Sequence, residues 1–196
     1  MWNNSRLVIA SNNPGKIREI KAILQHRFGD ILSMAEAGLN MDVPETGATF
    51  EENAVLKAVA VAREAGCSAL ADDSGLAVDA LGGAPGIYSA RYSGGDDLDN
   101  NDKLLRDMES KRDRKARYIC VMALAAPDGA VITAEGRCEG SIAHEQKGKR
   151  GFGYDPLFLV DGYGCAMAEL SDDVKNGISH RKHAIEALLG KLEGQP

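Results

Sequence analysis

The chain has 196 residues, of which 44% are hydrophobic and 27% charged, and its formal net charge is −6. This length is enough for one domain with a buried core, and the composition is that of an ordinary globular protein. The acidic balance argues against a stable complex with nucleic acid, which needs a basic face for the phosphates. Four widely spaced cysteines, no secretory leader and no long apolar run predict free thiols in a cytoplasmic protein without a membrane partner.

The first predicted elements are a strand and a helix. Residues 7–10 form a short apolar run, and apolar residues then recur with helical spacing as far as Phe28. We expect Asn13 to cap this helix and Pro14 to take its first position. A helix N-terminus that follows a tight polar loop and carries Lys16 favours an anion site. An ordinary strand-to-helix connection with a surface lysine is the alternative.

A second helix is predicted from Thr49 to Gly66. Thr49 and Glu52 have the spacing of a capping box, and Gly66 suits the left-handed residue that ends a helix. Glu45 lies among turn residues in the loop before this helix. Lys57 lies within the helix, where a solvated surface role is the alternative to a functional one.

Two adjacent carboxylates, Asp72 and Asp73, follow the apolar run of residues 69–71. Burial of two carboxylates is costly unless cations or hydrogen bonds hold them. Because adjacent strand residues point to opposite faces, we expect one carboxylate to face a site and backbone N–H groups to hold the other. A polar turn between two short strands is the alternative, since Asp-Asp-Ser-Gly is good turn chemistry. The order strand, helix, strand suggests a parallel crossover.

The second half of the chain predicts further strands and helices. An antiparallel hairpin is expected, so the sheet should be mixed. His180 and His183 are three residues apart, but no third nitrogen or sulfur ligand accompanies them, so no metal site is predicted there. The predicted elements are a helix over residues 96–108, hairpin strands over 118–126 and 131–135, a strand over 157–160, and a C-terminal helix capped by Ser179.

The segment 147–156 is basic and glycine-rich and carries two aromatic residues. Glycines allow the backbone to approach a ligand closely, and an aromatic face can stack on a nucleobase. A flexible loop with Phe152 packed into the core is the alternative.

These segments are specific as an ordered set. They comprise Ser11 to Lys16, Glu45, Thr49 to Lys57, Ala-Asp-Asp-Ser-Gly with Gly-Gly-Ala-Pro-Gly, Gly-Phe-Gly-Tyr-Asp-Pro, and Ser-His-Arg. In this order, from about residue 6 to residue 192, the chain resembles the inosine/xanthosine triphosphate pyrophosphatase family. The resemblance implies one α/β domain over residues 1–196 with an elongated mixed β-sheet flanked by helices, and two lobes with a nucleotide cleft between them. It also implies Mg²⁺ dependence, a homodimer, and hydrolysis of ITP, dITP, XTP and dXTP to the monophosphate and pyrophosphate.

The resemblance also implies a role for each matching residue. Asp73 would be the general base and would bind Mg²⁺ together with Glu45. Lys57 would neutralise phosphate charge, and Ser74 would contact the substrate. The triphosphate would be held by Ser11, Asn12, Asn13, Pro14, Gly15 and Lys16. The base pocket would be lined by Phe152, which stacks on the purine, and by Gly153, Tyr154 and Asp155. Lys175, His180 and Arg181 would close over the base and the phosphates.

Two positions depart from the family pattern. Pro44 stands where relatives often carry a second acidic residue, and Gly177 is expected to loosen the turn before Ser179.

Arg181 offers only donors, which pair with the C6 oxygen of inosine or xanthosine and not with the amino group of adenosine. A pyrophosphatase for other modified triphosphates and a non-catalytic nucleotide-binding module are the alternatives. The Glu45 and Asp73 pair argues against the second, because binding alone requires neither a metal nor a base.

Overall fold

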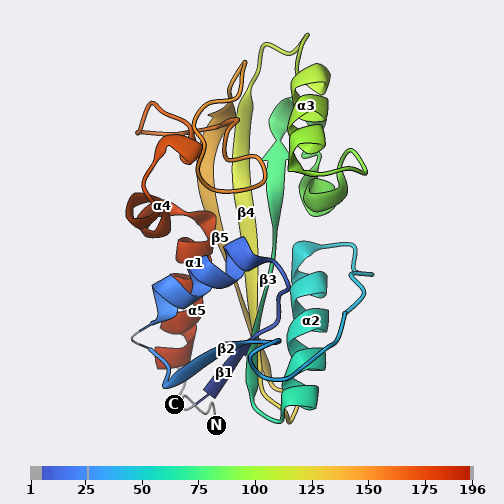
Figure 1. Ribbon diagram of the computed structural model, residues 1–196, viewed down its shortest axis with the longest axis vertical. Coiled ribbons are helices and arrows are strands. Elements are labelled where there is room, and N and C mark those ends of the chain that lie inside the picture. The colour runs from blue at the N-terminus through green and yellow to red at the C-terminus, as the bar shows by residue number, and fades with distance from the viewer. Residues whose placement is uncertain (1–5, 26, 195–196) are drawn as a thin grey trace. The chain divides into compact units, whose positions relative to one another are not determined.

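The computed structural model describes residues 6–25 and 27–194. Within them, six strands form a sheet in the order β2-β1-β3-β4-β5-β6 (Figure 1). β1 pairs in parallel with β2 and β3, and β5 pairs antiparallel with β6, so the predicted mixed sheet is confirmed. The strands are β1 Arg6–Ile9, β2 Asp30–Ser33, β3 Ser68–Val78, β4 Lys115–Ala125, β5 Val131–Ile142 and β6 Phe158–Val160.

Five α-helices accompany these strands in the described residues. None of them is both long enough and apolar enough to cross a membrane. The helices are α1 Pro14–Leu24, α2 Phe50–Ala65, α3 Asp97–Asp107, α4 Asp172–Ile178 and α5 His180–Glu193, with short 3₁₀ segments at Asp79–Leu81, Gly86–Arg91 and Met167–Glu169.

The chain divides into two compact units. The first comprises Met1–Asp73, Cys120–Gly136 and Arg181–Pro196, and the second comprises Ser74–Ile119 and Arg137–His180. The chain therefore passes from one unit to the other within each of its three long strands, β3, β4 and β5.

The first unit has a hydrophobic core on each face of its strands. α1 and α5 pack on one face, where Leu70 and Cys120 are buried, and α2 packs on the other, where Ala69 and Ala71 are buried (Figure 1). The alternation of Ala69, Leu70 and Ala71 between the two faces follows from the two-residue period of a strand. It predetermines that Asp72 and Asp73, further along β3, point to opposite faces.

The second unit has one core, formed by apolar residues of β3, β4, β5 and β6 with α3 against them. Tyr118 of β4 lies at its edge, with its ring 4.6 Å from that of Phe158 and 4.7 Å from that of His180. The nearly parallel Tyr118 and His180 rings, at 14°, fix the imidazole at the start of α5.

The predicted helix caps are largely confirmed. The Asn13 side chain accepts hydrogen bonds from the N–H groups of Gly15 and Lys16, and Pro14 is the first residue of α1. Thr49 accepts from the N–H of Glu52, and Gly66 ends α2 with φ +63°. The capping box itself is altered.

In place of the Thr49 N–H, the Glu52 carboxylate accepts the N–H of Ala48, at 2.6 Å.

Several element bounds differ from the predictions. β3 is one continuous strand through the Asp-Asp-Ser-Gly segment, so the turn alternative is wrong. α1 ends at Leu24 and does not reach Phe28, which lies beyond it and packs on the same core. β4 begins earlier than predicted and β5 ends later, while β2 and α4 were not predicted.

Gly177 lies inside α4, so it does not loosen a turn before Ser179.

Candidate active site

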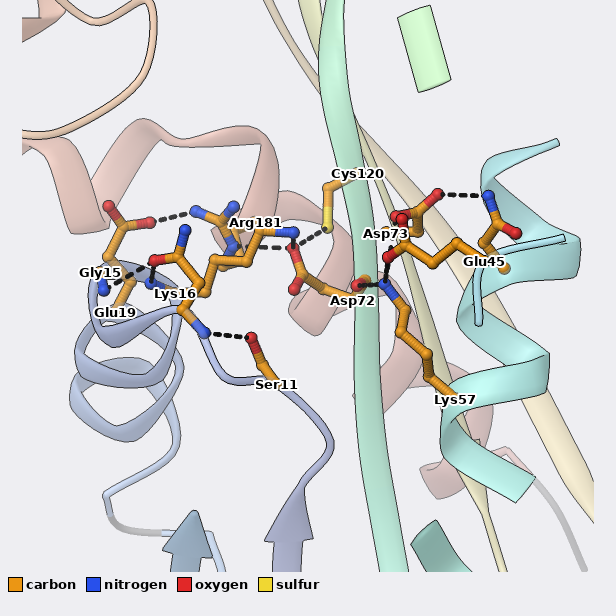
Figure 2. A network of polar contacts seen from close by, with 12 residues as sticks. Ser11, Gly15, Lys16, Glu19, Glu45, Lys57, Asp72, Asp73, Cys120 and Arg181 are labelled. Carbon is orange, nitrogen blue, oxygen red and sulfur yellow. Dashed lines mark hydrogen bonds and ion pairs between the residues drawn. The ribbon is translucent and has the colours of Figure 1, made fainter. Parts of the chain in front are cut away.

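Asp72 and Asp73 lie side by side in β3 and point to opposite faces of the strand (Figure 2). Asp72 is 1% exposed and Asp73 is 6% exposed. Each therefore requires compensation for the loss of water around its charge. The two carboxylates obtain it from different groups.

Asp73 faces α2 and the loop before it. Lys57 Nζ lies 3.1 Å from Asp73 Oδ1 and 2.6 Å from Glu45 Oε1, so one ammonium joins the two predicted metal ligands (Figure 2). Asn53, which is fully buried, donates from Nδ2 to Asp73 Oδ2 at 3.2 Å. Its amide oxygen accepts the N–H of Gly47 at 2.8 Å. Asn53 thus connects the loop of Glu45 to the strand of Asp73.

These contacts shift two pKa values. Burial raises the pKa of Asp73, and the nearby Glu45 charge adds to that shift, while Lys57 and Lys16 oppose it. Burial alone lowers the pKa of Lys57, but the charges of Asp73 and Asp72 and the bond to Glu45 outweigh burial, so the pKa is raised. Lys57 therefore remains cationic, and Asp73 is a stronger base than an ordinary aspartate.

Asp72 faces α1 and α5 and is held by cations. Lys16 Nζ and Arg181 Nε each lie 3.2 Å from Asp72 Oδ2, and the Arg181 guanidinium also forms an ion pair with Glu19 (Figure 2). Arg181 is 1% exposed. The thiol of Cys120 lies 4.0 Å from the same carboxylate oxygen, and burial raises its pKa, so it stays protonated. The sequence predicted that backbone N–H groups would stabilise the second carboxylate, but cations provide much of the stabilisation of Asp72.

The α1 N-terminus lies beside this network. The Asn13 side chain accepts from the N–H of Gly15 at 2.8 Å and of Lys16 at 3.1 Å. Ser11 accepts the N–H of Asn13 at 3.2 Å, and Asn12 and Pro14 are exposed. The segment is thus a preformed turn at a helix N-terminus, in which side chains already accept from the N–H groups of Asn13, Gly15 and Lys16. The positive end of the helix dipole and the Lys16 ammonium are the features that would favour an anion there.

The predicted purine-binding residues gather in the second unit around Asp155. Its carboxylate receives Lys175 Nζ at 2.6 Å, the N–H of Phe152 at 3.0 Å and the hydroxyl of Tyr118 at 3.3 Å. Asp155 and Lys175 are 3% and 5% exposed, whereas Phe152 is half-buried with the Lys175 ammonium 4.6 Å from its ring centre. A Cβ at Gly151 would collide with the Asp155 carboxylate, so glycine is required there.

The remaining predicted residues take different places. Tyr154 is buried in the core of the second unit, and its hydroxyl donates to the carbonyl of Ser89 at 2.8 Å. His180 is 5% exposed and stacks on Tyr118. Ser74 follows Asp73 in β3 and is half-buried. The structure thus brings the phosphate and metal candidates together in one unit and most of the purine candidates in the other.

Sequence reasoning missed several residues that hold these groups. Glu19 and Asn53 read as ordinary polar positions on helices, and Tyr118 as a strand residue. Burial of these polar side chains is what shows that they hold other groups, because a buried polar side chain needs a hydrogen-bonding partner. That signal is absent from a single sequence.

The donor set on the Asp73 side fits Mg²⁺. Two carboxylates, Glu45 and Asp73, converge on one ammonium, so this side already gathers negative charge around a cation. No group of three or more His, Cys, Asp or Glu side chains suited to a metal occurs in residues 6–25 and 27–194. Mg²⁺ commonly takes only one or two carboxylates and completes its shell with phosphate oxygens and water.

Comparison with known proteins identifies the family to which the chain belongs. The sequence profile of the Ham1 family matches residues 7–191. The chain belongs to the Ham1 family, and the family resemblance seen in its motifs is confirmed.

Among its relatives are two proteins named dITP/XTP pyrophosphatase. The protein from Bacillus licheniformis is 49% identical over 191 residues, which cover 95% of this chain and 97% of the relative. The protein from Bacillus subtilis is 48% identical over 190 residues, covering 95% and 96%. The solved structure of the Staphylococcus aureus Ham1 protein matches with a TM-score of 0.86 at 44% identity, over 98% of this chain and 100% of the other. The predicted α/β fold class is thereby confirmed.

Proposed function

We propose that this protein is a pyrophosphohydrolase that converts dITP, ITP, XTP and dXTP to the monophosphate and pyrophosphate, and so removes non-canonical purines from the nucleotide pool. One observation carries the proposal: Asp73 and Glu45 share the ammonium of Lys57 in the same unit in which α1 presents its capped N-terminus and Lys16. A cation site and an anion site in one compact unit suit a magnesium–triphosphate substrate.

Asp73 is the proposed general base. Its raised pKa suits it to accept the proton of a water that attacks the α-phosphorus, while pyrophosphate leaves. Asn53 holds one carboxylate oxygen and Lys57 the other, which fixes the orientation of the base. Ser74, next in the strand, is the proposed contact to the substrate.

Phosphate charge is the second requirement of the reaction. The residues Ser11 to Lys16 and the ammonium of Lys57 stabilise negative charge on the leaving pyrophosphate. Glu45 and Asp73 would hold Mg²⁺, which when bound supplies further positive charge to the phosphate oxygens.

The purine is assigned to residues of the second unit. Phe152 is the stacking residue, and the buried ion pair of Asp155 with Lys175 fixes the loop that carries it. His180, Gly153 and Tyr154 complete this assignment. The reading of the C6 oxygen by Arg181 stays a prediction, because the Arg181 guanidinium is already shared by Glu19 and Asp72. We also infer a homodimer, which the family resemblance implies and which sedimentation of the purified protein tests. The widely spaced cysteines favour a cytoplasmic location.

Product analysis with a panel of triphosphates and Mg²⁺ tests the activity. We expect monophosphate and pyrophosphate from ITP, dITP and XTP, and little from ATP. Faster turnover of a modified pyrimidine triphosphate would assign the protein to another substrate class. Binding of ITP without any turnover at saturating Mg²⁺ would make it a binding module.

A further inference from the structure

Gly153 is held at both of its backbone polar groups by side chains of one helix. Asp97 Oδ2 accepts the Gly153 N–H at 2.8 Å, and Asn101 Nδ2 donates to the Gly153 carbonyl at 3.1 Å. Asp97 and Asn101 are four residues apart in α3, so they project from the same face of the helix. The Asn101 NH₂ group thus pairs with the Gly153 carbonyl, and the Asp97 carboxylate pairs with the Gly153 N–H. Gly153 lies between Phe152 and Asp155.

The segment held in this way has little regular structure of its own. Residues 151–157 form bends and turns, and Gly153 adopts a left-handed conformation with φ +61°. The Phe152 N–H is bound by the Asp155 side chain. Backbone hydrogen bonds hold the ends of the loop, such as those of the Arg150 N–H with the carbonyl of Ala168 and of the Ala168 N–H with the carbonyl of Asp155, both at 3.1 Å. At the centre of the loop, by contrast, side chains hold the N–H groups of Phe152 and Gly153 and the Gly153 carbonyl.

Asn101 carries a cost that points to a specific role. It is 1% exposed, and within the described part of the chain its amide oxygen has no hydrogen-bond partner. An apolar side chain of the same size would avoid that unpaired oxygen. The amide is thus accounted for by its NH₂ group, which donates to the carbonyl of Gly153.

We propose that Asn101, assisted by Asp97, is a positioning residue for purine specificity, because it fixes the loop that presents Phe152 and Asp155. This inference rests on the proposed function, in which that loop binds the purine. It assigns to α3 an indirect part in substrate choice, through the loop.

Asn101→Asp is the central test. The change keeps the shape but replaces the donor by an oxygen that faces the Gly153 carbonyl. We expect kcat/KM for ITP to fall about tenfold or more, mainly through KM, because base binding acts equally in the ground and transition states. The value for ATP should change little, so the ITP/ATP ratio falls. Hydrogen exchange of residues 148–156 should become faster.

Asn100→Asp is the matched control. Asn100 is the neighbouring buried amide of α3, at 2% exposed, but it binds Ser93 and the carbonyl of Ala90. Its substitution should leave the ITP/ATP ratio and loop exchange unchanged. Asp97→Ala removes the other bond from an exposed position and should reproduce the Asn101→Asp result in weaker form. It therefore keeps the test valid if Asn101→Asp fails to fold.

Phe152→Ala separates failure of this inference from failure of the proposed function. If Phe152→Ala lowers the ITP/ATP ratio but Asn101→Asp and Asp97→Ala do not, the loop binds the purine without help from α3 and the inference is overturned. If Phe152→Ala leaves the ratio unchanged, the assignment of the loop is wrong. If the inference and the proposed function are both right, the double variant Asn101→Asp/Phe152→Ala should have an ITP/ATP ratio little lower than that of Phe152→Ala alone. The effects of coupled residues are not additive.

Discussion

Asp72 and Asp73 are neighbours in one strand, yet their surroundings differ in charge. On the Asp72 side, two carboxylates, Asp72 and Glu19, meet two cations, Lys16 and Arg181. On the Asp73 side, Asp73 and Glu45 share the single ammonium of Lys57. In these ion pairs, carboxylates and cations are equal in number on the Asp72 side, whereas two carboxylates contact one ammonium on the Asp73 side.

The difference indicates which carboxylate is structural and which is chemical. A buried carboxylate matched by cations is stable in place and gains nothing from a further cation. A pair of carboxylates with one ammonium attracts a divalent ion, and burial, with a smaller contribution from the Glu45 charge, raises the pKa of Asp73. Four experiments test this division, from the largest expected effect to the smallest.

Arg181→Ala should be the most damaging to the fold. It leaves Glu19 and Asp72 buried with one cation fewer, and loss of one partner of a buried ion pair costs about 3–5 kcal/mol. Chemical denaturation measures the loss. Arg27→Ala, whose ion pair with Glu193 is exposed, is the control and should change stability little. If Arg181→Ala is as stable as wild type and instead lowers kcat/KM for ITP far more than for ATP, the guanidinium reads the base.

Asp73→Asn should be the most damaging to turnover while the fold is kept. It retains the shape of the side chain and removes its basicity, so kcat should fall by at least ~10²-fold, in the range for a positioned general base. Nucleotide affinity should weaken less. Steady-state kinetics alongside Asp72→Asn decides the assignment. Near-normal turnover of Asp73→Asn with an inactive Asp72→Asn would reverse the roles of the two carboxylates.

Glu45→Gln should raise the Mg²⁺ requirement. It removes one of two carboxylates from the proposed metal site, and we expect at least about a tenfold weaker affinity, since even outer partners of metal sites contribute that much. Calorimetric titration with Mg²⁺ measures the affinity directly. Glu51→Gln, in the first turn of α2 and bound to Thr133, is the matched control. Equal Mg²⁺ affinity in the two variants would remove Glu45 from the site.

The smallest effect concerns stability and pH in the presence of a chelator. A carboxyl with a raised folded-state pKa contributes stability that is fully present below its ordinary value, 3.8, and is lost as the pH rises through the folded-state pKa. Asp73→Asn lacks this carboxyl. The melting temperature of Asp73→Asn should therefore rise relative to that of the wild type as the pH increases from about 4 to 7. A difference that does not vary with pH would mean that the pKa of Asp73 is not raised.

Interactions between neighbours in the chain were more predictable from the sequence than interactions between distant residues. The caps at Asn13 and Gly66 depend on neighbours in the chain, and the sequence located them correctly. The Asp-Asp-Ser-Gly segment reads equally well as a turn, because the groups that stabilise it as a strand are distant. Lys57 is separated from Asp73 by 16 positions and Arg181 from Asp72 by 109.

Short or polar features were the least predictable. β2 has only four residues and pairs along one edge of β1, so its local pattern is weak. Asn53 and Asn101 are polar helix residues whose burial depends on tertiary contacts. The family motifs named the candidate site residues, but not the side chains that hold them in place.

The two hydrogen bonds of the Asn53 side chain constrain the length of the segment between Gly47 and Asn53. The amide joins Gly47 at one end to Asp73 at the other, so one planar group of fixed size sets where the Glu45 loop meets β3. Residues 34–44, which precede that loop, do not enter this connection. A change in length between Gly47 and Asn53 would therefore alter the separation of the two carboxylates directly, whereas a change within residues 34–44, where Met34 is buried and Leu39 packs on the core, would act through packing.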